Sequence, residues 1–321
     1  MTDLFSLIKD TGAFRTIKGE KASGRLSHAY LILTQDKENL TEYLKIFAKL
    51  IACKDGNPCR ECRTCRMIDD GVFSDLYVYP KNGESIVSDE VNELIEESYV
   101  KPIESDKKIF ILSQAQNMNA QAQNKLLKTL EEPPENVCIL IGATAEFPLL
   151  PTVKSRVKKL EIPAFSDDKI FSALIEDCPD KERLEEAIKC GDGTVGQAKL
   201  NYSDQKLKEI TALISDLLVN MKSSGDVLEY STKISKLKCD FATFLSVLEL
   251  KLRDKLISIT KENGGEPLKS ADNGFTAGAL VFALESINGA YERMKFNANA
   301  TMLLEWTLFK ILEGKYKWQK L

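Results

Sequence analysis

The stretch Ala29-Tyr-Leu-Ile-Leu33, followed by Thr34-Gln-Asp-Lys-Glu-Asn-Leu-Thr41 and an amphipathic segment, decides the fold. Its first five residues form an apolar run with the length of a buried strand. After the polar residues, apolar positions recur at helical spacing, namely Leu44, Phe47, Ala48, Leu50 and Ile51. The stretch therefore predicts a strand, a loop and a helix in succession.

The same alternation continues along the first half of the chain. Further strands are predicted at Leu76 to Tyr79, Ile109 to Ser113 and Val137 to Gly142, with helices around Asp89 to Tyr99 and Ala120 to Leu130. Alternating strands and helices predict a parallel sheet covered by helices on both faces. In such folds the ligand lies at the carboxyl ends of the strands, where the loop after Leu33 belongs.

Length, charge and apolar runs limit the class of protein. The 321 residues suggest two or three domains, and 44 Lys plus Arg against 48 Asp plus Glu give a net charge of -4. This balance argues against a dedicated nucleic-acid binder. No apolar run approaches the ~20 residues of a membrane span, and Met1-Thr-Asp-Leu4 does not begin a secretion signal. We therefore expect a cytoplasmic protein without a membrane partner.

Four of the eight cysteines lie within thirteen residues, at Cys53, Cys59, Cys62 and Cys65. Cytoplasmic cysteines at such spacing, around turn residues, are typical of a tetrahedral zinc site. Because cysteine fills all four ligand positions, no position is open for a catalytic water, and we expect a structural Zn²⁺. The alternative is a chance cluster of reduced or redox-active thiols.

The loop after the first strand departs from the phosphate-binding pattern G-x-x-x-x-G-K-[S/T]. Thr34 and Asn39 stand at the two glycine positions, Leu40 replaces the lysine, and Thr41 takes the hydroxyl position. Leucine cannot offset phosphate charge, so we expect no bound ATP. The apolar strand Lys108 to Leu112 also ends in Ser113-Gln114, with no carboxylate to hold magnesium.

Three segments carry a resemblance to a known family. They are Gly24-Arg-Leu-Ser-His-Ala-Tyr-Leu31, Gln121-Ala-Gln-Asn-Lys-Leu-Leu-Lys-Thr-Leu-Glu-Glu-Pro-Pro134 and Leu149-Leu-Pro-Thr-Val-Lys-Ser-Arg156. With the cysteine insertion, this sequence resembles the clamp-loader subunits of bacterial DNA polymerase III over roughly residues 10 to 200. Within that family, delta-prime members often lack the glycine-lysine loop, and the sequence is similar to them.

The resemblance implies both an architecture and a role. It implies a RecA-like AAA+ domain at residues 1–163 with the zinc module inserted at 53–65, a helical lid at 164–203 and a helical collar at 204–321. It also implies that Arg156 is an arginine finger, donated in trans to ATP on a neighbouring subunit. The implied partners are the delta and gamma/tau subunits in a hetero-pentamer, which loads the sliding clamp on primed DNA during DNA replication.

Three hypotheses remain open from the sequence. The first is a non-catalytic subunit of the DNA polymerase III holoenzyme, a part of the DNA-directed DNA polymerase with no enzyme activity of its own. The second is an active AAA+ ATPase subunit with an unorthodox phosphate loop. The third is a zinc-ribbon protein that binds DNA through Arg60, Arg63 and Arg66.

Overall fold

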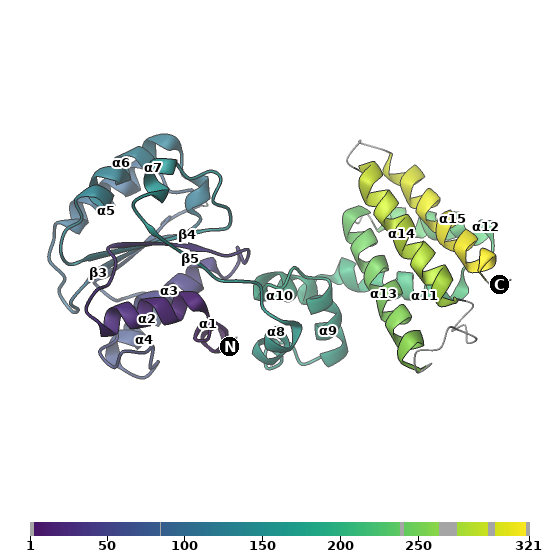
Figure 1. Ribbon diagram of the computed structural model, residues 1–321, viewed down its shortest axis with the longest axis horizontal. Helices are drawn as coiled ribbons and strands as arrows, with labels where there is room; N and C mark the ends of the chain where they lie inside the picture. The colour runs from purple at the N-terminus through teal and green to yellow at the C-terminus, as the bar shows by residue number, and fades with distance from the viewer. Residues whose placement is uncertain (1–2, 84, 238–240, 263–274, 295–298, 319–321) are drawn as a thin grey trace. The chain divides into compact units, whose positions relative to one another are not determined.

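The computed structural model describes residues 3–83, 85–237, 241–262, 275–294 and 299–318. The chain divides into two compact units, Met1–Tyr202 and Ser203–Leu321. The first contains a sheet and helices, and the described part of the second contains the remaining helices (Figure 1). The predicted fold class, an α/β part followed by an all-α part, is confirmed.

A five-stranded parallel sheet organises the first unit, with its strands in the RecA-like order β2-β3-β4-β1-β5. Every neighbouring pair is parallel, and β1 lies between β4 and β5. Four strands fall where the sequence predicts them, whereas β5 was not predicted. The strands are β1 (Ala29–Leu33), β2 (Leu76–Tyr79), β3 (Lys108–Leu112), β4 (Val137–Ala143) and β5 (Lys158–Glu161).

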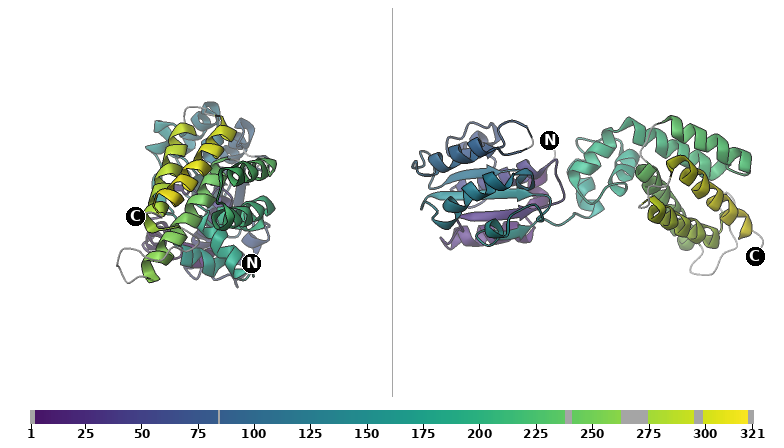
Figure 2. Two further views of the ribbon diagram at one scale, coloured as in Figure 1. Left: turned by 90° about the vertical axis from the view of Figure 1, so that its right-hand side faces the viewer. Right: turned by 90° about the horizontal axis from the view of Figure 1, so that it is seen from above.

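Alternate residues of β1 to β4 face two separate helix layers, as a doubly covered sheet requires. Tyr30 and Ile32 pack in the core beneath α1 (Leu4–Ile8), α2 (Gly12–Ala22) and α3 (Leu40–Ala52). Leu31 packs in a second core beneath α5 (Ser88–Ser98) and α6 (Ala120–Glu131). Both layers are visible in Figure 1 and in the right-hand view of Figure 2.

The remaining helices of the first unit are short, and the last three of them follow the sheet and precede the second unit. They are α4 (Arg63–Asp69), the 3-10 helix η1 (Ala115–Asn117), α7 (Pro151–Lys154), α8 (Asp167–Leu174), α9 (Lys181–Lys189) and α10 (Val195–Ser203). Apolar residues of α8, α9 and α10 belong to the same core as those of α1 to α3. The division into residues 1–163, 164–203 and 204–321 stays a prediction.

Long amphipathic helices make up the described part of the second unit. They are α11 (Gln205–Asn220), α12 (Ser224–Lys236), α13 (Phe241–Glu262), α14 (Ala277–Met294) and α15 (Ala300–Lys317). Helices α14 and α15 pack side by side (Figures 1 and 2). Across the described ranges, no helix has both the length and the apolar character that a membrane crossing needs.

Candidate metal centre and degenerate nucleotide site

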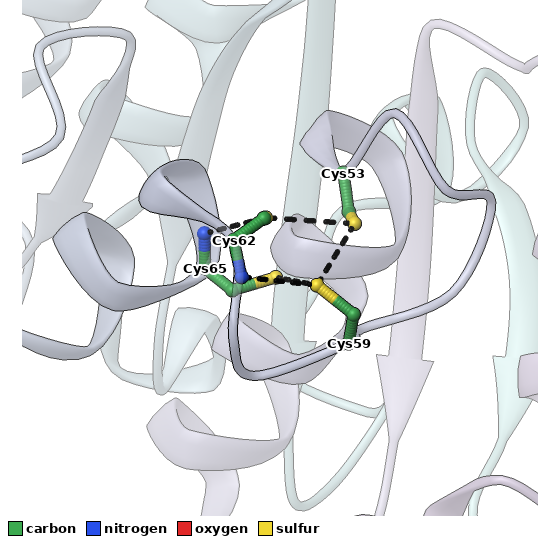
Figure 3. Close-up of side chains that lie close together, drawn as sticks. All are labelled: Cys53, Cys59, Cys62 and Cys65. Atoms are coloured by element: carbon green, nitrogen blue, oxygen red, sulfur yellow. Dashed lines mark hydrogen bonds between the residues drawn. The ribbon is translucent and has the colours of Figure 1, made fainter.

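The four clustered cysteines converge on one point in the structure. Their Sγ atoms all lie within 4.8 Å of one another (Figure 3). The Sγ of Cys53 is 3.7 Å from that of Cys59 and 3.8 Å from that of Cys62, and Cys59 is 3.9 Å from Cys65. Sulfurs about 2.3 Å from a central zinc ion form a tetrahedron with edges of about 3.8 Å. The cluster can therefore hold a metal ion, and its size fits zinc.

Two helix ends and a turn bring these thiols together. Cys53 directly follows α3, and Cys62 caps the start of α4, where its sulfur accepts the backbone N–H of Cys65. Between them, Gly56 and Arg60 have φ of 70° and 61°, in the left-handed region that permits tight reversal. The backbone N–H of Cys62 donates to the sulfur of Cys59 at 3.3 Å. These N–H···S bonds orient the sulfur atoms toward one another.

The thiols differ in how readily they ionise. The hydrogen bond from the Cys65 backbone N–H lowers the pKa of Cys62 to about 7. Burial raises the pKa of Cys53 and of Cys65. Because metals bind thiolates, a dication held among them offsets the cost of ionising the two buried sulfurs.

Two arginines around the cluster are engaged with carboxylates of the same chain. Arg60 pairs with Asp3 and lies over the ring of Phe5, 5.0 Å from its centroid. Arg63 pairs with Glu104 at 3.2 Å. Arg66 is exposed. The first two guanidinium groups would have to leave these partners to bind a phosphate backbone.

The loop between β1 and α3 contains the positions that a phosphate-binding loop would use. Thr34 is buried beside the end of β1, and Asn39 stands immediately before α3. Leu40 begins α3 with a fully buried side chain that leans on Gly142 of β4, where an added β-carbon would approach Leu40 Cδ1 to 2.8 Å. The residue at the lysine position therefore points into the core and not toward a ligand.

Thr41 and Ser113 meet at the place where the two halves of a metal and phosphate site would join. The hydroxyls of Thr41, on the first turn of α3, and Ser113, just after β3, are 2.8 Å apart. They lie 72 residues apart in the sequence. An ATPase uses such positions to hold magnesium through a hydroxyl and a carboxylate. Here one neutral hydrogen bond joins the two positions.

A residue without an assigned role in the sequence pattern proves central to the loop. Asp36 is only 2% exposed, and its carboxylate accepts hydrogen bonds from Asn39, from the Tyr43 hydroxyl at 2.7 Å and from the Gly196 backbone N–H at 3.1 Å. Local sequence gave no signal for this arrangement, because Gly196 lies 160 residues away.

A small crevice of about 190 Å³ opens beside the loop, at the carboxyl ends of the central strands. Two glutamates, Glu146 and Glu161, contribute carboxylates to it. Lys159 pairs with Glu146 and keeps the pKa of that carboxyl below its ordinary value. The complete lining is Leu33, Thr34, Gln35, Thr144, Glu146, Glu161, Ile162, Pro163 and Ala164. Acidic groups at this position disfavour a phosphate anion.

Arg156 lies apart from this loop, between α7 and β5. Its guanidinium pairs with Glu131 at 2.7 Å and donates to the carbonyl of Thr152 at 2.9 Å, while about a third of the side chain (34%) stays exposed. Gln123 of α6 fixes the approach to α7 by bonding the Pro148 carbonyl and the Leu150 N–H. The segment Gln121 to Pro134 therefore positions Arg156 through both Gln123 and Glu131.

The sequence of this chain is similar to those of DNA polymerase III subunits. Residues 9–166 match the family model described as DNA polymerase III, delta subunit. The delta' subunit of DNA polymerase III from Bacillus subtilis is 35% identical over 154 residues, or 47% of each chain. The tau subunit from the same organism is 25% identical over 340 residues, which cover 94% of this chain and 60% of tau.

A solved structure, a gamma subunit-related protein of DNA polymerase III from Thermotoga maritima, is 18% identical with a TM-score of 0.41. It covers 94% of this chain and 99% of its own. The chain spans about half to three fifths of the length of the delta' and tau relatives. The match over residues 9–166, about half of the chain, together with the delta' and tau relatives, supports a place for this chain in the clamp-loader family of DNA polymerase III subunits.

Proposed function

We propose that the chain is a delta-prime-like clamp-loader subunit that binds no ATP and acts on the ATP site of a neighbour. In this role it assembles with delta and gamma/tau subunits in a hetero-pentamer and helps to load the sliding clamp on primed DNA. The observation that carries the proposal is the state of its own phosphate loop. Leu40 is buried against β4, and Thr41 is bonded to Ser113 in place of a metal.

The position of Arg156 supports a role in trans. A guanidinium stabilises the charge that spreads over phosphoryl oxygens during transfer, and such a finger is worth about 10³ to 10⁵ in rate. Arg156 is partly exposed on a short segment that α6 holds in place. Its partner Glu131 is itself 48% exposed, so the pair is a surface ion pair that costs little to exchange for a phosphate.

Arg156→Ala tests this proposal in the reconstituted complex. We expect the pentamer to assemble normally, while hydrolysis at the one neighbouring ATP site falls by about 10³-fold or more. Arg156→Lys should lose most of the rate as well, since lysine lacks the planar fork of donors. The readout is single-turnover ATP hydrolysis with clamp and primed DNA.

Lys159→Ala is the matched control, because it removes a nearby exposed cation that belongs to a different ion pair. Hydrolysis should stay unchanged in that variant. Equal losses for Lys159→Ala and Arg156→Ala would show a general effect of positive charge and would remove the finger assignment. Micromolar binding of a labelled ATP analogue to the isolated chain would contradict the proposed absence of nucleotide.

The proposed cofactor is a structural Zn²⁺ held by Cys53, Cys59, Cys62 and Cys65. All four ligand positions come from the chain, and the sulfur separations fit tetrahedral zinc. The closed set of four cysteine ligands and the net charge of -4 weigh against a DNA-binding zinc ribbon. The role of this module is therefore to join the end of α3 to α4.

A further inference from the structure

Asp36 is a buried carboxylate surrounded by hydrogen-bond donors. Its Oδ1 accepts the backbone N–H of Asn39 at 3.2 Å, and its Oδ2 accepts the Asn39 side-chain amide at 3.0 Å. Oδ2 also accepts the Tyr43 hydroxyl and the Gly196 backbone N–H. Burying an ionised carboxylate is costly unless such donors compensate it. The surrounding residues supply that compensation from two separate parts of the first unit.

Two helix N-termini face this carboxylate. Asn39 directly precedes α3, which has 13 residues, and Gly196 lies in the first turn of α10, which has 9. Helix N-termini carry partial positive charge and unpaired N–H groups, the combination that binds phosphate in nucleotide-binding loops. Tyr43 remains a donor, because burial and the Asp36 charge both raise its pKa.

The packing around Asp36 leaves room only for a glycine at position 196 of α10. A β-carbon added at Gly196 would overlap Asp36 Oδ1 and approach Glu38 Cβ to 2.7 Å. Thr194, just before α10, accepts the Gln197 N–H with its hydroxyl, so the first turn of α10 is separately capped. The Gly196 N–H therefore remains available for the distant carboxylate.

We propose that Asp36 is a built-in anion that takes the place of a nucleotide phosphate and fastens α10 to the loop between β1 and α3. In a nucleotide-binding protein, a ligand phosphate bridges such elements only while it is bound. Here the bridging charge belongs to the chain, so the contact is permanent. The consequence is a first unit whose α10 does not open and close with a ligand, whether or not the chain assembles as proposed above.

Asp36→Ala in the full-length chain tests this proposal. We expect the Gly196 amide to exchange hydrogen at least about tenfold faster, because a buried charged acceptor is lost. Asn39 should exchange faster as well, while amides in the centre of the sheet, such as that of Ile111, keep their protection. Asp36→Asn preserves the shape and one acceptor oxygen and should give a smaller increase. Amide exchange followed by NMR provides the measurement.

Gly196→Ala perturbs the same contact between Asp36 and Gly196 from the side of α10. We expect it to accelerate exchange at Gly196 neighbours and at Asn39, since the new methyl group displaces Asp36. Gly19→Ala is the matched control: Gly19 lies within α2 and an added β-carbon there meets nothing within 4 Å. That variant should keep or improve protection.

The double variant Asp36→Ala with Gly196→Ala separates one shared contact from two independent lesions. If both residues act through this contact, the double variant should exchange more slowly than the sum of the two single effects predicts, because alanine at 36 removes the overlap with Asp36 Oδ1 and leaves only the approach to Glu38 Cβ. Additive effects would overturn the proposal. So would unchanged exchange at Gly196 in a folded Asp36→Ala chain, or greater exchange in Gly19→Ala than in Gly196→Ala.

Discussion

Asp75 shows how one buried side chain can organise a loop beside the cysteine cluster. It is fully buried, and its carboxylate accepts the backbone N–H groups of Ile103, Glu104 and Ser105 at 2.7 to 2.8 Å. Glu104 is also the partner of Arg63 in the cysteine module. Asp75 therefore fixes the loop that receives this module.

We predict that Asp75→Ala lowers the unfolding free energy of the first unit by about 3 kcal/mol, because three donors lose a charged acceptor. Ser105→Ala, the control, removes only a hydroxyl that bonds to Asp75 and to the Lys107 carbonyl, and it should cost about 1 kcal/mol. Urea unfolding followed by circular dichroism measures both. Tryptophan fluorescence should stay unchanged, since Trp306 and Trp318 lie in the second unit. Equal losses for the two variants would contradict this account.

Single residues also mark the limit of sequence reasoning about the site. Leucine at position 40 was visible as a departure from the phosphate-loop pattern. The four clustered cysteines were visible as a match to the spacing of a zinc site. The pairing of Thr41 with Ser113 depends on the sheet bringing two strand ends together. Asp36 received no role from the loop pattern, whereas the structure buries it against Gly196. Contacts across such separations have no local signature.

At the scale of elements, β5 is the one strand that the sequence did not predict, and its composition explains why. Its sequence Lys-Lys-Leu-Glu carries three charged residues in four, and most of them are exposed. It pairs only with β1, at the edge of the sheet, where charged side chains protect against aggregation. The buried strands β1, β3 and β4 are apolar runs and were recognised for that reason.

Helix α12 begins with a capping box whose strength depends on pH. The Ser223 hydroxyl accepts the Asp226 N–H, and the Asp226 carboxylate accepts the N–H groups of Lys222 and Ser223. These backbone hydrogen bonds hold the pKa of Asp226 below its ordinary value. Stability from Asp226 is thus fully present above its unfolded pKa of about 3.9 and is lost as pH falls through the folded pKa.

We predict that Ser223→Ala lowers the unfolding free energy of the second unit by about 1 kcal/mol at pH 7. Asp226→Asn should also destabilise at pH 7, and its difference from the unaltered chain should shrink as the pH falls below about 3.9 and vanish once the pH is below the lowered folded pKa of the carboxylate. Ser224→Ala, one residue further along, is the control and should cost nothing. Urea unfolding followed by tryptophan fluorescence at both pH values is the measurement. A difference for Asp226→Asn that is as large at pH 3 as at pH 7 would be inconsistent with the capping role.

Across the whole molecule, α3 links the two candidate sites. Its first turn carries Leu40 and Thr41, next to the Asp36 contact, and its last residue precedes Cys53. The helix is buried along most of its length between the sheet and α2. A change at the cysteine cluster can therefore affect the loop at the start of α3 through this one helix. The second unit consists of other helices, so we expect such a change to leave it unaffected.

Metal removal tests this division of the molecule. The purified full-length chain should contain one zinc ion, measurable by emission spectroscopy, and Cys62→Ser should release it. Because metal-binding free energy is also folding free energy, chelation should speed hydrogen exchange most in residues 53–69 and then along α3. Exchange in residues 203–237 and the urea midpoint from Trp306 and Trp318 should not change. Substoichiometric zinc in the unaltered chain, or equal loss of protection in both units, would contradict a structural metal confined to the first unit.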